Sequence, residues 1–86
     1  MKHRRVKGGE FTTVNEYENI LDRDGKNNML TNVTVVNMGL ERIHVIINNG
    51  DELPLDSTET MTLGDLTIDS IVIVEKDATV RYMGVE

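Results

Sequence analysis

The stretch that decides the fold is LTIDSIVIVEKDATVRYMGV, residues 66–85, near the end of the 86-residue chain. Its β-branched residues gather in two segments, 71–74 and 79–85, and the charged triplet at 75–77 separates them. Because β-branched side chains fit a pleated strand better than a helix, each segment is expected to form a strand. The short polar link predicts that the two strands form a hairpin. The stretch therefore predicts an all-β protein whose last strand lies inside its sheet.

Earlier segments show the same alternation of apolar and polar positions. Val33, Val35 and Asn37 are expected to face one way, and residues 43, 45 and 47 share one face of the next strand. The sequence Asn48-Asn49-Gly50 is the strongest turn signal. Pro54 suggests a strand at a sheet edge or a strand end, because proline cannot donate a ladder hydrogen bond.

Turn signals recur about every eight to twelve residues, a spacing typical of a sandwich or barrel. We predict a small single-domain antiparallel β-sandwich over residues 11–86, and a small five- or six-stranded barrel is the alternative. Residues 1–10, which contain Gly8-Gly9, are expected to form a flexible basic N-terminal arm.

Charge is distributed unevenly along the chain. The candidate electrostatic arm carries Lys2, Arg4, Arg5 and Lys7 and no acidic residue before Glu10, whereas the whole chain has a net charge of −6. Such an arm can contact a neighbouring subunit or nucleic acid, or it can be a solvated tail. The acidic body argues against a broad nucleic-acid surface, since phosphate contacts require clustered Lys and Arg.

The composition limits how a chain of this size can be stabilised. It has no cysteine, no tryptophan, one phenylalanine and two tyrosines, so the core depends on aliphatic side chains. Self-association would bury more apolar surface, and a homo-oligomer is expected. Some strands look apolar on both faces, and the candidate interface is made of Ile46, Ile71, Ile73, Met83 and Val85. Alternatively, these are scattered surface residues.

No arrangement of residues indicates catalysis. Ser57 and Ser70 are outside any nucleophile elbow, and His44 has no evident partner while His3 lies in the expected arm. The Asp22-x-Asp24-Gly25 sequence lacks the further ligands of a calcium loop and is expected to be a turn. We therefore expect a protein that is not an enzyme, with no cofactor and no metal. No signal peptide or membrane span is expected either.

Residues 33–85 resemble small β-sandwich virion structural and accessory proteins of tailed bacteriophages. The resemblance rests on a pattern of strands and turns, which includes Ile46–Gly50, Leu53-Pro54-Leu55, Thr60–Asp65 and the final segment Asp69–Tyr82. It implies a non-enzymatic head-decoration, connector or tail-associated subunit that self-assembles and attaches to other virion proteins. It also implies a location in the virion after synthesis in the host cytoplasm.

A small phage or bacterial binding module is the alternative function, acting on a host protein, a nucleic acid or a small ligand. A barrel could present a binding face for such a partner. Single-stranded nucleic acid would require stacking aromatic residues, and Phe11, Tyr17 and Tyr82 are few.

Overall fold

The computed structural model describes residues 5–22 and 29–86. In these residues there are eight strands and a single turn of 3₁₀ helix. The elements are β1 (Val6–Thr12), β2 (Glu18–Asn19), η1 (Ile20–Asp22), β3 (Thr31–Asn37), β4 (Ile43–Ile47), β5 (Glu52–Leu55), β6 (Thr60–Thr62), β7 (Ile71–Ile73) and β8 (Thr79–Val85). The described part contains no helix long and apolar enough to cross a membrane.

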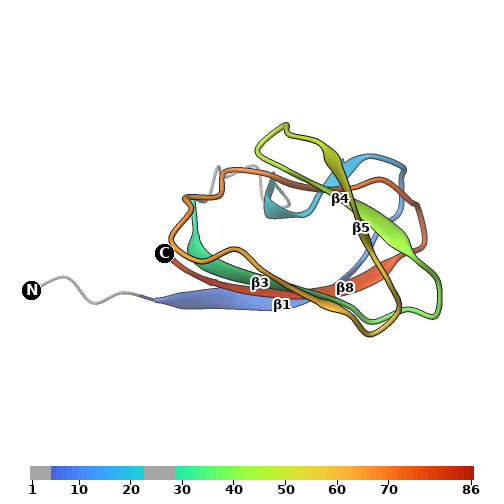
Figure 1. The fold of residues 1–86 in the computed structure, drawn as a ribbon, viewed down its shortest axis with the longest axis horizontal. Coiled ribbons are helices and arrows are strands. Elements are labelled where there is room, and N and C mark those ends of the chain that lie inside the picture. Colours follow the sequence, from blue (N-terminus) through green and yellow to red (C-terminus); the bar gives the residue numbers. More distant parts are fainter. Residues whose placement is uncertain (1–4, 23–28) are drawn as a thin grey trace, which may run out of the picture.

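The strands form two four-stranded antiparallel sheets packed face to face. Sheet A has the order β1-β8-β3-β6, and sheet B has the order β2-β7-β4-β5. Figure 1 shows β1, β8 and β3 side by side in one layer, with β4 and β5 in the other. The predicted antiparallel β-sandwich is therefore confirmed.

The topology is that of a long hairpin rolled into a sandwich. Counting outward from the turn between β4 and β5, the strand pairs are β4–β5, β3–β6, β2–β7 and β1–β8. These pairs fall alternately in sheet B and sheet A. Rolling adds two contacts, β4–β7 and β3–β8, which join the pairs into full sheets. Eight strands in this order form a jelly roll.

The predicted hairpin over residues 71–85 is wrong, although both of its strands are present. β7 pairs with β2 and β4 in sheet B, whereas β8 pairs with β1 and β3 in sheet A. The link between them crosses from one sheet to the other. Strand propensity reports where a strand forms, but its hydrogen-bond partner depends on distant segments.

The turn predicted at Asn48–Gly50 is confirmed, and it joins β4 to β5 within sheet B. Asn48 and Asn49 have φ values of 51° and 58°, and the N–H of Gly50 donates to Ile47 O at 2.9 Å. Positive φ at both central residues is the requirement of a type I′ hairpin turn, which Asn tolerates well. The prediction for Pro54 also holds, because β5 is an edge strand.

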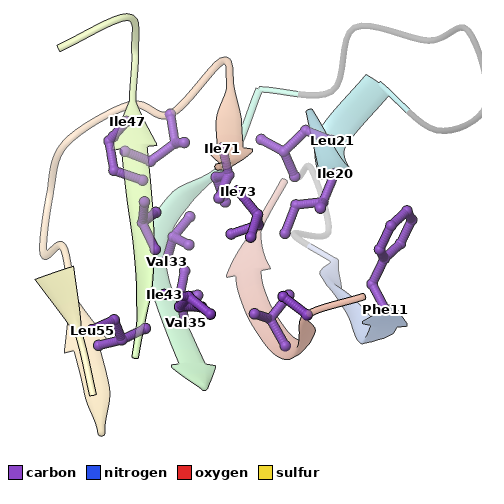
Figure 2. Close-up of a cluster of buried hydrophobic side chains, with 14 of the residues drawn as sticks. Phe11, Ile20, Leu21, Val33, Val35, Ile43, Ile47, Leu55, Ile71 and Ile73 are labelled. Atoms are coloured by element: carbon purple, nitrogen blue, oxygen red, sulfur yellow. The ribbon is translucent and has the colours of Figure 1, made fainter. Parts of the chain in front are cut away.

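An aliphatic core fills the space between the sheets. Figure 2 shows Val33 and Val35 from β3 close to Ile43, Ile47, Ile71 and Ile73 from sheet B. All of these side chains are buried, and those of β3 and of β4 share one face of their strand as the alternation predicts. The whole buried apolar cluster comprises Phe11, Ile20, Leu21, Leu30, Val33, Val35, Ile43, Val45, Ile47, Leu55, Ile68, Ile71, Ile73, Ala78 and Val80.

The structure corrects the arm predicted over residues 1–10. Strand β1 begins at Val6 and pairs along its whole length with β8, so the β domain starts before Phe11. The two glycines, which suggested flexibility, lie inside this strand. At Gly8 the strands approach so closely that a Cβ would lie 2.2 Å from Tyr82 O. Glycine is required there for contact between backbones.

Candidate interaction surface

The outer face of sheet A is the surface turned away from the core. Val35 and Val80 are buried, so they mark the inner face of sheet A. Neighbours along a strand point to opposite sides and directly opposed residues point to the same side, so the strand register gives the residues of the outer face. They are Val6, Gly8, Glu10 and Thr12 of β1, Thr79, Arg81, Met83 and Val85 of β8, Thr34 and Val36 of β3, and Thr60 and Thr62 of β6.

This outer face carries almost no charge. Its charged residues are Glu10 and Arg81, which lie opposite each other and form an ion pair at 3.6 Å. The chain as a whole has nine basic and fifteen acidic residues. A sheet face made of Val, Met, Thr and Gly with a single neutral pair is therefore unlike the rest of the sequence. Depletion of charge is a mark of the central part of protein interfaces.

Large apolar side chains on this face are open to solvent. Val6 is 68% exposed and Met83 is 54% exposed, and Val36 and Val85 are half-buried. Val6, Gly8 and Met83 also help to line a shallow, mainly apolar hollow of about 340 Å³ over β1 and β8. The arrangement can accept an apolar side chain from another molecule.

The candidate interface predicted from sequence divides into three groups. Met83 and Val85 lie on the outer face of sheet A. Ile71 and Ile73 are fully buried in the core, so their assignment to a subunit contact is wrong. Ile46 is half-buried on the outer face of sheet B. Alternation identified which residues share a face, but it could not identify which face the opposite sheet covers.

The Tyr17 side chain crosses the outer face of sheet B. The N–H of Tyr17 donates to Val74 O at 3.0 Å, next to β7, and the Tyr17 hydroxyl donates to Glu52 Oε1 on β5 at 3.3 Å. Because β4 lies between β7 and β5, the Tyr17 side chain crosses β4 on the side of Ile46. The negative charge of Glu52 and its hydrogen bond raise the pKa of Tyr17.

His44 has a partner that the sequence did not reveal. Its Nδ1 lies 2.7 Å from Glu75 Oε2, and Glu75 Oε1 accepts the backbone N–H of His44 at 2.7 Å. The two residues are separated by 31 positions, so no local pattern could have linked them. Glu75 thus fastens β4 to the link between β7 and β8, and this provides a structural role for the pair.

Of the predicted basic arm, Lys2 and Arg4 lie outside the described residues, as does His3. Lys7 is in β1 and pairs with Glu86 at 3.8 Å, and Arg5 O accepts the N–H of Glu86 at 2.8 Å. These two residues therefore belong to the body of the sandwich. Asp24 and Gly25 of the predicted polar turn also lie outside the described residues.

A second, more polar hollow of about 330 Å³ opens at the end of the sandwich, between the β3–β4 and β7–β8 links. Acidic and basic side chains both line it: Glu41, Arg42, Glu75, Lys76 and Asp77. Hydrogen bonding to Asp56 and its negative charge raise the pKa of Arg42. Within the described ranges no three His, Asp or Glu residues are grouped so that they could hold a metal ion. This mixture of charges does not select a ligand of either sign.

Comparisons with protein-family models, with curated proteins and with solved structures give no match.

Proposed function

We propose that this protein is a non-enzymatic structural or accessory subunit of a tailed-bacteriophage virion. It self-associates. It also attaches to a larger particle of virion proteins, and this attachment uses the outer face of sheet A. The observation that carries the proposal is the exposure of Val6 and Met83 on a sheet face whose charged residues, among those the structure describes, are Glu10 and Arg81, which form an ion pair with each other. On this proposal the protein is made in the host cytoplasm and resides in the virion.

The fold supports a structural role by analogy. Jelly rolls serve as capsid and lectin domains and also as cupins, so the fold alone does not select among them. In this chain the space between the sheets is filled by aliphatic side chains such as Val35, Val45 and Ile73, each fully buried. The outer surfaces are therefore better placed than the interior to meet a partner.

The size of the face suggests how the subunit would be used. Strands β1, β8 and β3 have seven residues each and β6 has three, so at about 3.3 Å per residue and about 4.8 Å between strands the face measures roughly 380 Å². A standard stable interface buries about 800 Å² per partner, so one face alone would bind weakly. Repeated attachment of many copies to one particle would compensate through multivalency.

The experiment compares the Met83→Glu and Leu40→Glu variants with the unmodified protein. Both changes add one negative charge at an exposed apolar residue, but Leu40, which is 94% exposed, lies in the link between β3 and β4 rather than on the outer face of sheet A. Attachment is measured by quantitative mass spectrometry of particles purified on density gradients from producing cells. Thermal unfolding confirms that each variant remains folded.

We expect Met83→Glu to reduce particle occupancy by about tenfold or more, since a buried unpaired carboxylate is costly, and Leu40→Glu to leave it unchanged. Absence of the unmodified protein from purified particles would refute the virion role. Equal occupancy of the Met83→Glu variant and the unmodified protein would refute the assignment of the outer face of sheet A.

A further inference from the structure

The four sheet edges differ in how well they are protected. β2 and β6 have only two and three residues, and β5 contains Pro54, which removes a backbone donor. β1 has seven residues and no proline, and its residues from Val6 to Glu10 are exposed. Figure 1 shows it along the border of its layer. Short strands and proline are common devices that prevent edge pairing, and β1 uses neither of them.

The backbone of β1 presents alternate residues to this open edge. The N–H of Glu86 donates to Arg5 O at 2.8 Å, and the N–H of Thr13 donates to Ala78 O at 2.9 Å. In an antiparallel ladder the hydrogen-bonded pairs alternate, so the odd-numbered residues of β1 bond to β8. The N–H and C=O groups of Val6, Gly8, Glu10 and Thr12 therefore point toward the free edge.

We propose that β1 pairs antiparallel with β1 of a second copy of this chain, about a two-fold axis through Gly9. This register uses all seven residues of each strand, since Val6 then lies opposite Thr12 and Gly8 lies opposite Glu10. These are the residues whose backbone groups face the free edge, so each opposed pair exchanges hydrogen bonds. The two A sheets become one eight-stranded sheet.

The side chains fit this register. Lys7 lies opposite Phe11, and Glu10 lies opposite Gly8, so no like charges are directly opposed. A parallel arrangement in register would instead place Lys7 against Lys7 and Glu10 against Glu10, which is unfavourable. At the axis, a Cβ added to Gly9 would meet nothing within 4 Å, so a side chain introduced at this position has room.

The dimer would also enlarge the surface assigned above. A two-fold axis perpendicular to the sheet leaves both outer faces of sheet A on the same side. Together they would offer roughly 760 Å², which is close to the area of about 800 Å² that one partner contributes to a standard interface. This use of the doubled face rests on the proposed function, whereas the pairing of β1 rests on the edge strand alone.

A cysteine placed at Gly9 provides a direct test, because the chain has no other cysteine. The two Gly9 residues form a non-hydrogen-bonded pair, whose Cα atoms lie about 4.5 Å apart, within the range for a disulfide. We expect the Gly9→Cys variant to form disulfide-linked dimers under mild oxidation, measured by non-reducing electrophoresis and intact mass. The matched control is Thr62→Cys, an exposed residue on the opposite edge of sheet A.

Cross-linking of the Gly9→Cys variant at least about tenfold faster than that of Thr62→Cys, with the difference lost in denaturant, is the expected result. Equal rates for the two variants, or no dimer from Gly9→Cys, would overturn the pairing.

A second test removes one backbone donor. Glu10→Pro deletes an N–H that points to the free edge and leaves the bonds to β8 in place, whereas Glu10→Ala removes the same side chain and keeps the donor. In sedimentation equilibrium we expect Glu10→Pro to weaken dimerisation by about tenfold or more relative to Glu10→Ala. Circular dichroism checks that both variants fold.

Equal dimerisation of Glu10→Pro and Glu10→Ala would contradict the proposal, as would a monomeric unmodified protein at about 100 µM, a concentration that reveals even weak association. Recovery of β1 paired with a different protein, with no self-association, would likewise contradict it. Loss of particle attachment in Met83→Glu with an intact dimer would leave the pairing of β1 standing, so the two proposals fail independently.

Discussion

Replacing Asn37 by alanine should cost much of the stability of this domain. Asn37 is the last residue of β3 and is fully buried beside the aliphatic core. Its Nδ2 donates to Glu41 O at 2.7 Å and to Leu55 O at 3.0 Å, and its Oδ1 accepts the N–H of Gly39 at 2.9 Å. One side chain therefore joins the end of β3, the link that follows it and the end of β5, across the two sheets.

The expected loss follows from the three hydrogen bonds. The bond to Leu55 O is buried, and losing a partner inside a protein costs about 1–3 kcal/mol. The other two are partly buried and contribute about 0.5–1.5 kcal/mol each. Allowing for relaxation and some access of water, we expect a loss of about 2–4 kcal/mol. A single core of this size supplies about 3–5 kcal/mol in total, so the variant would be barely folded.

The assay is urea and thermal unfolding followed by far-ultraviolet circular dichroism. For a domain of this length about 1 kcal/mol shifts Tm by roughly 4–8 °C, so Asn37→Ala should lower Tm by about 10–25 °C. Thr34→Ala, at a half-buried outward position in the same strand, is the control and should cost less than about 1 kcal/mol.

The isosteric variant Asn37→Asp separates lost hydrogen bonds from lost volume. It leaves no cavity but directs a carboxylate toward two carbonyl oxygens, and at neutral pH it should destabilise at least as much as alanine does. A loss below about 1 kcal/mol for both Asn37 variants would refute the view that this side chain holds the end of the sandwich together.

Three further outcomes are expected. Gly84→Ala should cost about 1–3 kcal/mol in urea unfolding, because its Cβ would lie 2.9 Å from Val33 Cγ2 in the core, and an unchanged midpoint would contradict this close packing. Asn49→Ala should destabilise by about 1–2 kcal/mol while Asn49→Gly should not, since φ is 58° there, and equal midpoints would count against a left-handed residue. In a background with Tyr17 as the sole tyrosine, absorbance titration should show that Glu52→Gln lowers the pKa of Tyr17, because Glu52 raises it in the folded protein. A folded-state pKa above the unfolded value means that this contribution to stability is present below about pH 10 and is lost as pH rises through the folded-state pKa, so an unaltered titration would exclude the contact.

Local patterns were sufficient for the strands that are covered on one face by the other sheet. Residues 43, 45 and 47 alternate with polar or half-buried neighbours; they share one face as predicted, and the structure buries all three. The turn at Asn48–Asn49 was also predictable, since its backbone conformation depends on these residues themselves.

Local sequence patterns failed to predict a strand that forms because a distant strand supplies its hydrogen bonds. β1 contains Gly8-Gly9 and its first five residues are all exposed, so most of the strand shows no alternation. It is a strand because β8 supplies its hydrogen bonds. Residues 71–74, in contrast, are apolar without interruption, and a continuous apolar run does not indicate which side faces inward.

The candidate interaction surface was also predicted only in part from the sequence. Met83 and Val85 were identified from sequence, but Val6 and Gly8 belong to a segment 70 or more positions away that was expected to be an arm. Only the register between β1 and β8 brings them onto one face and places Glu10 beside Arg81.

The sequence by itself determined that this chain forms short antiparallel strands with an aliphatic core and a tight turn after Ile47. Those properties depend on side-chain shape, period and local backbone preference, which act over a few residues. The tertiary structure alone decided that β7 and β8 belong to different sheets, that Ile71 and Ile73 are core residues, and that the face around Met83 is left open. Strand pairing joins residues far apart in the chain, and its free energy depends on which faces meet when the long hairpin rolls up.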